Sequence, residues 1–206
     1  MNTTHPNKIK QRVQTLVVFC GIIILIGKFT AYFLTNSVGI LTDAMESIVN
    51  VAAGFISLYA IRLAAKPKDE DHPFGHGKIE LISASIEGIL IFTAGGIIIY
   101  EGIRRIFSPS LIESLDIGII IVAVSGAINY LLGWYSIYQG KKYDSIALVA
   151  GGKHLQSDTY STIGLVAGLL ILYFTGLTWV DSALAIIFGA IIAFTGIGIL
   201  RKTINN

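Results

Sequence analysis

The stretch Leu41-Thr-Asp-Ala-Met-Glu-Ser-Ile-Val-Asn50 places three oxygen-bearing side chains inside a segment that otherwise has the composition of a membrane span. At 3.6 residues per turn, Asp43, Glu46 and Asn50 share one helix face, because they are three and seven residues apart. An acidic residue at the centre of a membrane helix costs about 2.5–3.5 kcal/mol, whereas each leucine or isoleucine returns only about 0.3–0.6 kcal/mol. We therefore expect this face to line a polar cavity and bind a cation. The alternative is a polar stripe that joins helices by hydrogen bonds.

The composition of the whole chain agrees with this interpretation. Of its 206 residues 53% are hydrophobic and only 14% are charged, and apolar runs of membrane-span length recur from end to end. The formal net charge of +2 is too small to indicate a nucleic-acid partner. The single cysteine, Cys20, excludes an intrachain disulfide and a CxxC metal site. The chain is therefore predicted to be an all-α, multi-pass protein of the lipid bilayer.

The apolar runs predict a bundle of six transmembrane helices. We expect these spans at residues 13–35, 38–64, 79–107, 113–139, 145–175 and 178–201. A cytoplasmic leader, residues 1–12, is expected before a transmembrane domain of residues 13–203. A cytoplasmic loop, residues 65–78, separates the second and third spans. The sequence stops at Asn206, so no soluble domain is expected after the sixth span in this chain.

Basic residues predict the orientation of the bundle. They gather before the first span, between the second and third, between the fourth and fifth, and after the sixth: Lys8, Lys10, Arg12, Arg62, Lys66, Lys68, Lys78, Lys141, Lys142, Arg201 and Lys202. The opposite end receives Arg104 and Arg105. Because lysine and arginine are enriched on the cytoplasmic side, both termini are predicted to be cytoplasmic, with the protein in the inner or plasma membrane of the cell.

The fifth predicted span carries a second polar pair. His154 and Asp158 are four residues apart and therefore share a helix face, although a histidine and an aspartate near a helix start can also serve as capping residues. Together with Glu46 and Asn50 they offer three oxygens and one nitrogen, a set that tetrahedral Zn²⁺ accepts and that also suits Mn²⁺, Fe²⁺ or Co²⁺. Two carboxylates with two neutral ligands leave a charge of minus two, which one divalent ion cancels. We expect protons to replace the metal when it leaves.

Two further side chains are candidates for proton movement near this set. His154 is the expected proton carrier, since the ordinary pKa of imidazole is nearest to cellular pH. Asp43 lies one turn from Glu46 and is expected to act as a relay carboxylate. The alternative, held equally open, is an ion pair between Asp43 and Lys28 of the first span.

The predicted cytoplasmic loop holds another cluster of possible ligands. Asp69, His72 and His76 are spaced by three and four residues and could close on one metal ion. The alternative, which composition alone favours, is a solvated turn of mixed charge.

Three stretches of the chain resemble the cation diffusion facilitator family. Residues 28–50 look like the first and second spans of that family, and residues 72–80, His-Pro-Phe-Gly-His-Gly-Lys-Ile-Glu, are similar to its cytoplasmic-loop motif. His154-Leu-Gln-Ser-Asp158 matches its fifth-span motif. The three occur in the family's order and spacing, and the six predicted spans cover essentially the whole chain.

The resemblance implies a homodimer that exports Zn²⁺ or a related divalent ion in exchange for protons by alternating access. It implies a transport site of Glu46, Asn50, His154 and Asp158. It also places Asp69, His72 and His76 where some members hold a second metal, which makes the two interpretations of that loop equally open.

The chain departs from the family pattern in two ways. The second-span pair is usually aspartate or histidine followed by aspartate, whereas here it is Glu46 followed by Asn50. Because some manganese-handling members place asparagine in this span, Mn²⁺, Fe²⁺ or Co²⁺ remain alternatives to Zn²⁺. Members also usually continue after the sixth span into a small cytoplasmic α/β domain.

Two other classes of function are alternatives to transport. An intramembrane metalloenzyme is disfavoured, because the spans contain neither HExxH nor a Ser/His or Cys/His nucleophile arrangement, so no catalytic residue or catalytic cofactor is expected. A membrane scaffold or sensor that binds metal without transporting it is the remaining alternative.

Overall fold

The computed structural model describes residues 4–64, 77–109 and 111–204, and these form six helices without a strand. The helices are α1 (Thr4–Thr35), α2 (Val38–Ala64), α3 (Gly77–Phe107), α4 (Leu115–Lys142), α5 (Ile146–Thr175) and α6 (Trp179–Ile204). The all-α prediction is confirmed, and each helix overlaps one predicted span. α1 begins nine residues before the predicted first span, so the part of the leader that the structure describes is helical and continuous with that span.

Five helices are long and apolar enough to cross a membrane. Within the described residues these segments are Asn7–Thr35, Val38–Tyr59, Leu115–Lys142, Ile146–Thr175 and Trp179–Arg201. The chain thus has the multi-pass architecture expected from its hydropathy. The sixth crossing and the cytoplasmic placement of the termini stay predictions.

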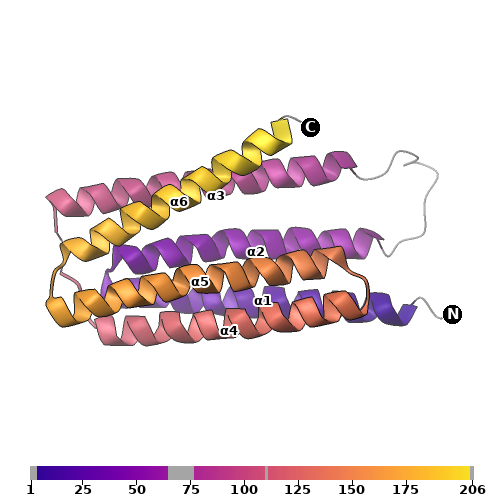
Figure 1. Cartoon of the computed structure of the whole chain (residues 1–206), viewed down its shortest axis with the longest axis horizontal. Helices are drawn as coiled ribbons and strands as arrows, with labels where there is room; N and C mark the ends of the chain where they lie inside the picture. Colours follow the sequence, from indigo (N-terminus) through magenta and orange to yellow (C-terminus); the bar gives the residue numbers. More distant parts are fainter. Residues whose placement is uncertain (1–3, 65–76, 110, 205–206) are drawn as a thin grey trace.

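The six helices form two groups that run along a common direction (Figure 1). α1, α2, α4 and α5 pack around one another, while α3 packs mainly against α6. α2 belongs to the first group and also contacts both helices of the second. One apolar cluster lies inside the four-helix group and includes Ile40 and Leu169, and another joins α2 to α3 and α6 through Leu41, Ile98 and Ala185.

The helix ends fix which residues face one another. Asn36 adopts a left-handed conformation, with φ of 57°, between α1 and α2, and Gly176 does the same, with φ of 68°, after α5. The side chain of Ser145 caps the first turn of α5 by accepting a hydrogen bond from the backbone N–H of Leu148. These breaks reverse the chain abruptly, so that successive helices run antiparallel.

Glycines let α4 and α5 approach at backbone contact. A Cβ atom added to Gly133 would lie 2.6 Å from the carbonyl oxygen of Gly152, and one added to Gly152 would lie 2.6 Å from that of Gly133. Neither position can accept a side chain without moving a helix, because the obstacle is backbone. This contact fixes the height of α5 within the bundle two residues before His154.

Candidate metal site between α2 and α5

The polar residues predicted on the second and fifth spans meet across the interface of α2 and α5. The amide Nδ2 of Asn50 donates a hydrogen bond to Oδ2 of Asp158 at 2.7 Å, and its Oδ1 lies 3.0 Å from Nε2 of His154. Nε2 of His154 lies 3.8 Å from Oδ2 of Asp158. The structure therefore brings three of the four residues predicted to bind the transported metal into one polar group.

Glu46, the fourth predicted ligand, lies on α2 one turn before Asn50. It is partly buried, and its charge interacts with those of Asp158, Asp43 and Lys28. Among the described residues, no lysine or arginine lies within ion-pair distance of Glu46 or Asp158. The side chain of His154 is 44% exposed, whereas that of Asp158 is 8% exposed, so the group has an accessible rim and a buried floor.

Asp43 and Lys28 form a separate ion pair one turn before Glu46, nearer the N-terminus of α2. Nζ of Lys28 lies 2.9 Å from Oδ1 of Asp43, and both side chains are almost fully buried. Thr162 of α5 donates a second hydrogen bond to the same carboxylate oxygen at 3.2 Å. Of the two alternatives that the sequence left open for Asp43, the structure contains the ion pair with Lys28, while a relay role stays a prediction.

Thr162 was not among the predicted site residues, although it lies four residues after Asp158 and hence on the same face of α5. Periodicity gave that signal, but only the packing of α5 on α2 identifies Asp43 as its partner.

The group at Asn50 is held by internal hydrogen bonds. Among the described residues no three His, Cys, Asp or Glu side chains converge, because one of the three side chains in contact is an asparagine. A hydrogen bond between Nε2 of His154 and Oδ1 of Asn50 requires the proton on Nε2. A metal bound through Nε2 must displace that proton, and a metal that takes Oδ2 of Asp158 must also compete with the amide of Asn50 for this oxygen.

The predicted loop ligands Asp69, His72 and His76 lie outside the described residues, and so does most of the predicted loop 65–78. Their binding of a second metal stays a prediction.

A further buried carboxylate, Asp181, lies at the start of α6 and was not among the predicted site residues. It is 3% exposed and accepts hydrogen bonds from Oγ of Ser37 at 2.6 Å, from the backbone N–H of Val38 at 2.7 Å and from that of Gly39 at 3.1 Å. Asp181 thus caps the N-terminus of α2 from another helix.

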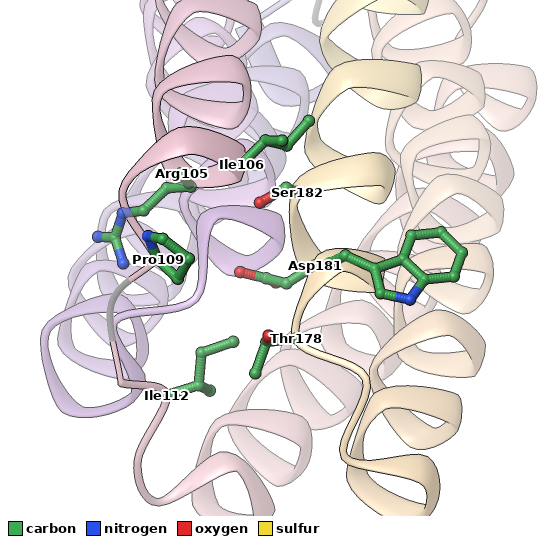
Figure 2. A pocket seen from close by; sticks show the side chains of 8 residues that line it. Arg105, Ile106, Pro109, Ile112, Thr178, Asp181 and Ser182 are labelled. Atoms are coloured by element: carbon green, nitrogen blue, oxygen red, sulfur yellow. The ribbon is translucent and has the colours of Figure 1, made fainter.

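Arg105 of α3 holds the same turn from the other side. Its guanidinium donates to the backbone oxygen of Asn36 at 3.2 Å and to Oδ1 of Asn36 at 2.7 Å. Figure 2 shows Asp181 and Arg105 around a small pocket of about 80 Å³ that they share with Pro109 and Thr178. We call this arrangement of Asp181, Arg105 and the turn at residues 36–39 the α2 clamp. An acidic residue within the apolar run of the last span was the sequence signal for it.

Comparisons with known proteins assign the domain. The model of the cation efflux transmembrane domain matches residues 15–206. The chain is 38% identical to an uncharacterised transporter of Synechocystis over 179 residues, which are 87% of this chain and 58% of that protein. It is 32% identical to the metal cation efflux system protein CzcD of Cupriavidus metallidurans over 187 residues, 90% of this chain and 57% of that protein.

A third relative is the cadmium, cobalt and zinc/H(+)-K(+) antiporter of Bacillus velezensis. The identity is 27% over 174 residues, which are 84% of this chain and 55% of that protein. The chain therefore spans a little over half the length of these relatives.

Proposed function

Because the chain belongs to the cation efflux family, we propose that it exports a divalent transition-metal ion from the cytoplasm in exchange for protons. The protein is a multi-pass integral protein of the plasma membrane. Glu46, Asn50, His154 and Asp158 are the proposed ligands of the transported ion.

One observation carries this proposal. Glu46 and Asp158 are two carboxylates at a helix interface. Among the described residues, the ion-pair contact they make is that of Asp158 with the imidazole of His154, at 3.8 Å. Uncompensated carboxylates in a membrane domain are costly, and a divalent cation supplies the charge that cancels both. The neutral imidazole and amide complete a set of one nitrogen and three oxygens.

Exchange for protons follows from the same contacts. Two carboxylates left without metal attract protons, which metal entry must expel, whereas a neutral His154 only moves its proton from Nε2 to Nδ1 when Nε2 binds the ion. Metal entry then releases protons, and metal release takes them up. The named exchange activity of the Bacillus velezensis relative is in keeping with such coupling.

Zn²⁺ is the proposed cargo, because a four-ligand nitrogen and oxygen set is the one it accepts most readily. Asn50 favours a second candidate, Mn²⁺, because a carboxamide oxygen in place of a carboxylate makes the set less charged and suits a metal that takes carbonyl and carboxylate oxygens. Fe²⁺ and Co²⁺ accept the same mixed set. A competition among the four ions on one sample separates cargo choice from the general order of affinities.

A transporter of this kind is further proposed to work as a homodimer with cytoplasmic termini. Figure 1 shows that the start of α1 and the link from α4 to α5 lie at the same end of the bundle. Lysine and arginine gather in these segments of the sequence, which supports the orientation. Analytical ultracentrifugation in detergent tests the dimer.

The test of function is metal flux into proteoliposomes with an imposed pH gradient. Wild type is expected to move Zn²⁺ or Mn²⁺ only when the gradient is present, and Asp158→Ala is expected to abolish this flux. Asp116→Ala is the matched control, because it removes an exposed carboxylate at the start of α4, away from the site. Metal binding without flux would favour a scaffold or sensor, and flux that ignores the pH gradient would exclude proton exchange.

A further inference from the structure

Asn129 is a buried polar residue of α4 with no assigned role. It is 3% exposed and lies in the middle of a helix whose neighbouring residues are mostly apolar. Among the described residues its side chain has no hydrogen-bond partner, although each buried carboxamide offers two donors and an acceptor. Its amide atoms are not among the fully enclosed side-chain atoms that lack a partner, and Asn129 lines a cavity in which a partner beyond the protein chain has room.

Asn129 lines a narrow cavity inside the four-helix group. The cavity has a volume of about 20 Å³, enough for one water molecule, and its other polar lining side chains are Ser47 and Asn50 of α2. Toward the end where α1 begins, Gln14 of α1 donates a hydrogen bond to the carbonyl oxygen of Gly54 at 3.0 Å and links α1 to α2 beside the cavity. A water here has two carboxamides and a hydroxyl as partners, which is the number that buried waters usually have.

Asn50 separates this cavity from the proposed metal site. The same side chain lines the cavity and also holds Asp158 and His154 on its other side. The amide Nδ2 of Asn50 donates to Oδ2 of Asp158 as long as Asn50 keeps its present orientation. To serve as a ligand, Asn50 must turn Oδ1 toward the metal, and its Nδ2 then needs another acceptor.

We propose that Asn129 is a positioning residue for the transported ion. When Asn50 turns its oxygen to the metal, a water in this cavity accepts a hydrogen bond from Nδ2 of Asn50 and donates one to Oδ1 of Asn129. The inference rests on the proposed function, since it assigns a partner to one of the proposed ligands. In this proposal Asn129 is not a ligand of the metal, and its effect passes through Asn50, with which it lines the cavity.

The test is the Zn²⁺ affinity of the purified full chain in detergent, measured by calorimetry for a set of variants. Asn129→Leu removes the acceptor at similar size and is expected to weaken Zn²⁺ binding about tenfold or more, as for other residues that orient a metal ligand. Asn129→Ser keeps a hydroxyl and leaves room for a second water, so most of the affinity should return. Ser125→Ala is the control, because Ser125 is a buried polar residue one turn earlier on α4 that does not line the cavity.

A double-mutant cycle distinguishes positioning from a general packing effect. In the Asn50→Ala background, Asn129→Leu should change the affinity less than twofold, because its target is gone. The same tenfold loss in both backgrounds, or no loss in the single variant, would overturn the proposal. If Asn129→Leu does not fold, the smaller Asn129→Val takes its place with the same two outcomes.

The failure of this inference is distinct from that of the proposed function. Zn²⁺ binding by Asp158→Ala is measured alongside, and unchanged binding in that variant contradicts the site itself. If Asp158→Ala loses Zn²⁺ binding while Asn129→Leu keeps the wild-type affinity, only the role of Asn129 is contradicted.

Discussion

Two regions of α2 bury carboxylates in opposite ways. At its N-terminus, Asp181 accepts three hydrogen bonds from residues 37–39, so both of its oxygens have permanent partners supplied by the turn itself. Two to three turns farther along α2, Asp158 of α5 contacts the neutral amide of Asn50 and the imidazole of His154, and neither Glu46 nor Asp158 pairs with a lysine or arginine among the described residues. Burial alone therefore does not identify a binding site in this protein. The incomplete compensation of the second group is the feature that supports the proposed metal site there.

Asp43 lies between these regions and combines features of both. It has a cation, Lys28, and a hydroxyl donor, Thr162, on one oxygen. Its other oxygen is buried without a hydrogen-bond partner in the part of the chain that the structure describes. Its charge is compensated by lysine, so it has no need of a metal, and this separates it from Glu46 one turn away.

The largest effect on stability is expected from removing the cation of this middle pair. Lys28→Met leaves the buried Asp43 charge unpaired, and such a change typically destabilises by about 3–5 kcal/mol. Denaturant unfolding in detergent measures it. The double variant Lys28→Met/Asp43→Leu should recover most of the loss, and a double variant as unstable as the single one would show that the ion pair is not the reason.

Next in size is the loss of metal binding on changing the α5 carboxylate. Asp158→Asn keeps the shape and the hydrogen-bonding capacity but removes one of the two charges that a divalent ion cancels. We expect at least about a 100-fold loss of Zn²⁺ affinity, equivalent to about 2.7 kcal/mol, with little change in stability. Titration calorimetry and thermal unfolding on the same sample give the affinity and the stability. If Asp158→Asn lowered the stability and left the Zn²⁺ affinity unchanged, Asp158 would be a structural residue and not a metal ligand.

Asp181→Asn should produce the opposite pattern. The new NH₂ group faces a backbone N–H at the start of α2, so one strong hydrogen bond is lost and the free energy of unfolding falls by about 1.5–3 kcal/mol. The Zn²⁺ affinity of the folded variant should stay within about twofold of wild type. Binding that falls as far as in Asp158→Asn would mean that the α2 clamp and the metal site are not separate.

The smallest effect distinguishes two adjacent arginines of α3. Both arginines pair with Glu101, but the Arg105 side chain is 12% exposed and also holds Asn36, whereas the Arg104 side chain is 63% exposed. Arg105→Ala should destabilise by about 1–2 kcal/mol, and Arg104→Ala, the control, by less than about 1 kcal/mol. If thermal unfolding showed equal losses of stability in the two variants, the contact of Arg105 with Asn36 would not stabilise the α2 clamp.

The sequence predicted the helices because apolar runs of span length are separated by strong breaks such as Asn36 and Gly176. It also predicted that Asn50, His154 and Asp158 come together, through their shared helix faces and through the motifs they belong to. α1 begins nine residues before the predicted first span, since Lys8, Gln11 and their neighbours are good helix formers that a prediction of the span from hydropathy leaves out.

The α2 clamp and the roles of Thr162 and Asn129 needed the structure. Periodicity shows which face of a helix is polar but not which helix lies against it. Asp181 is 138 residues beyond Asp43, and nothing in the spacing of either residue indicates that one caps α2 while the other pairs with Lys28. Such partners are set by the packing of α6 and α1 on α2.

The most direct test of the metal site is an X-ray absorption spectrum of Zn²⁺ bound to the purified chain. We predict a first shell of oxygens with one imidazole nitrogen at about 2.0–2.1 Å, and loss of the imidazole signal in His154→Gln. A sulfur ligand from Cys20, or an imidazole signal that persists unchanged in His154→Gln, would contradict a site between α2 and α5.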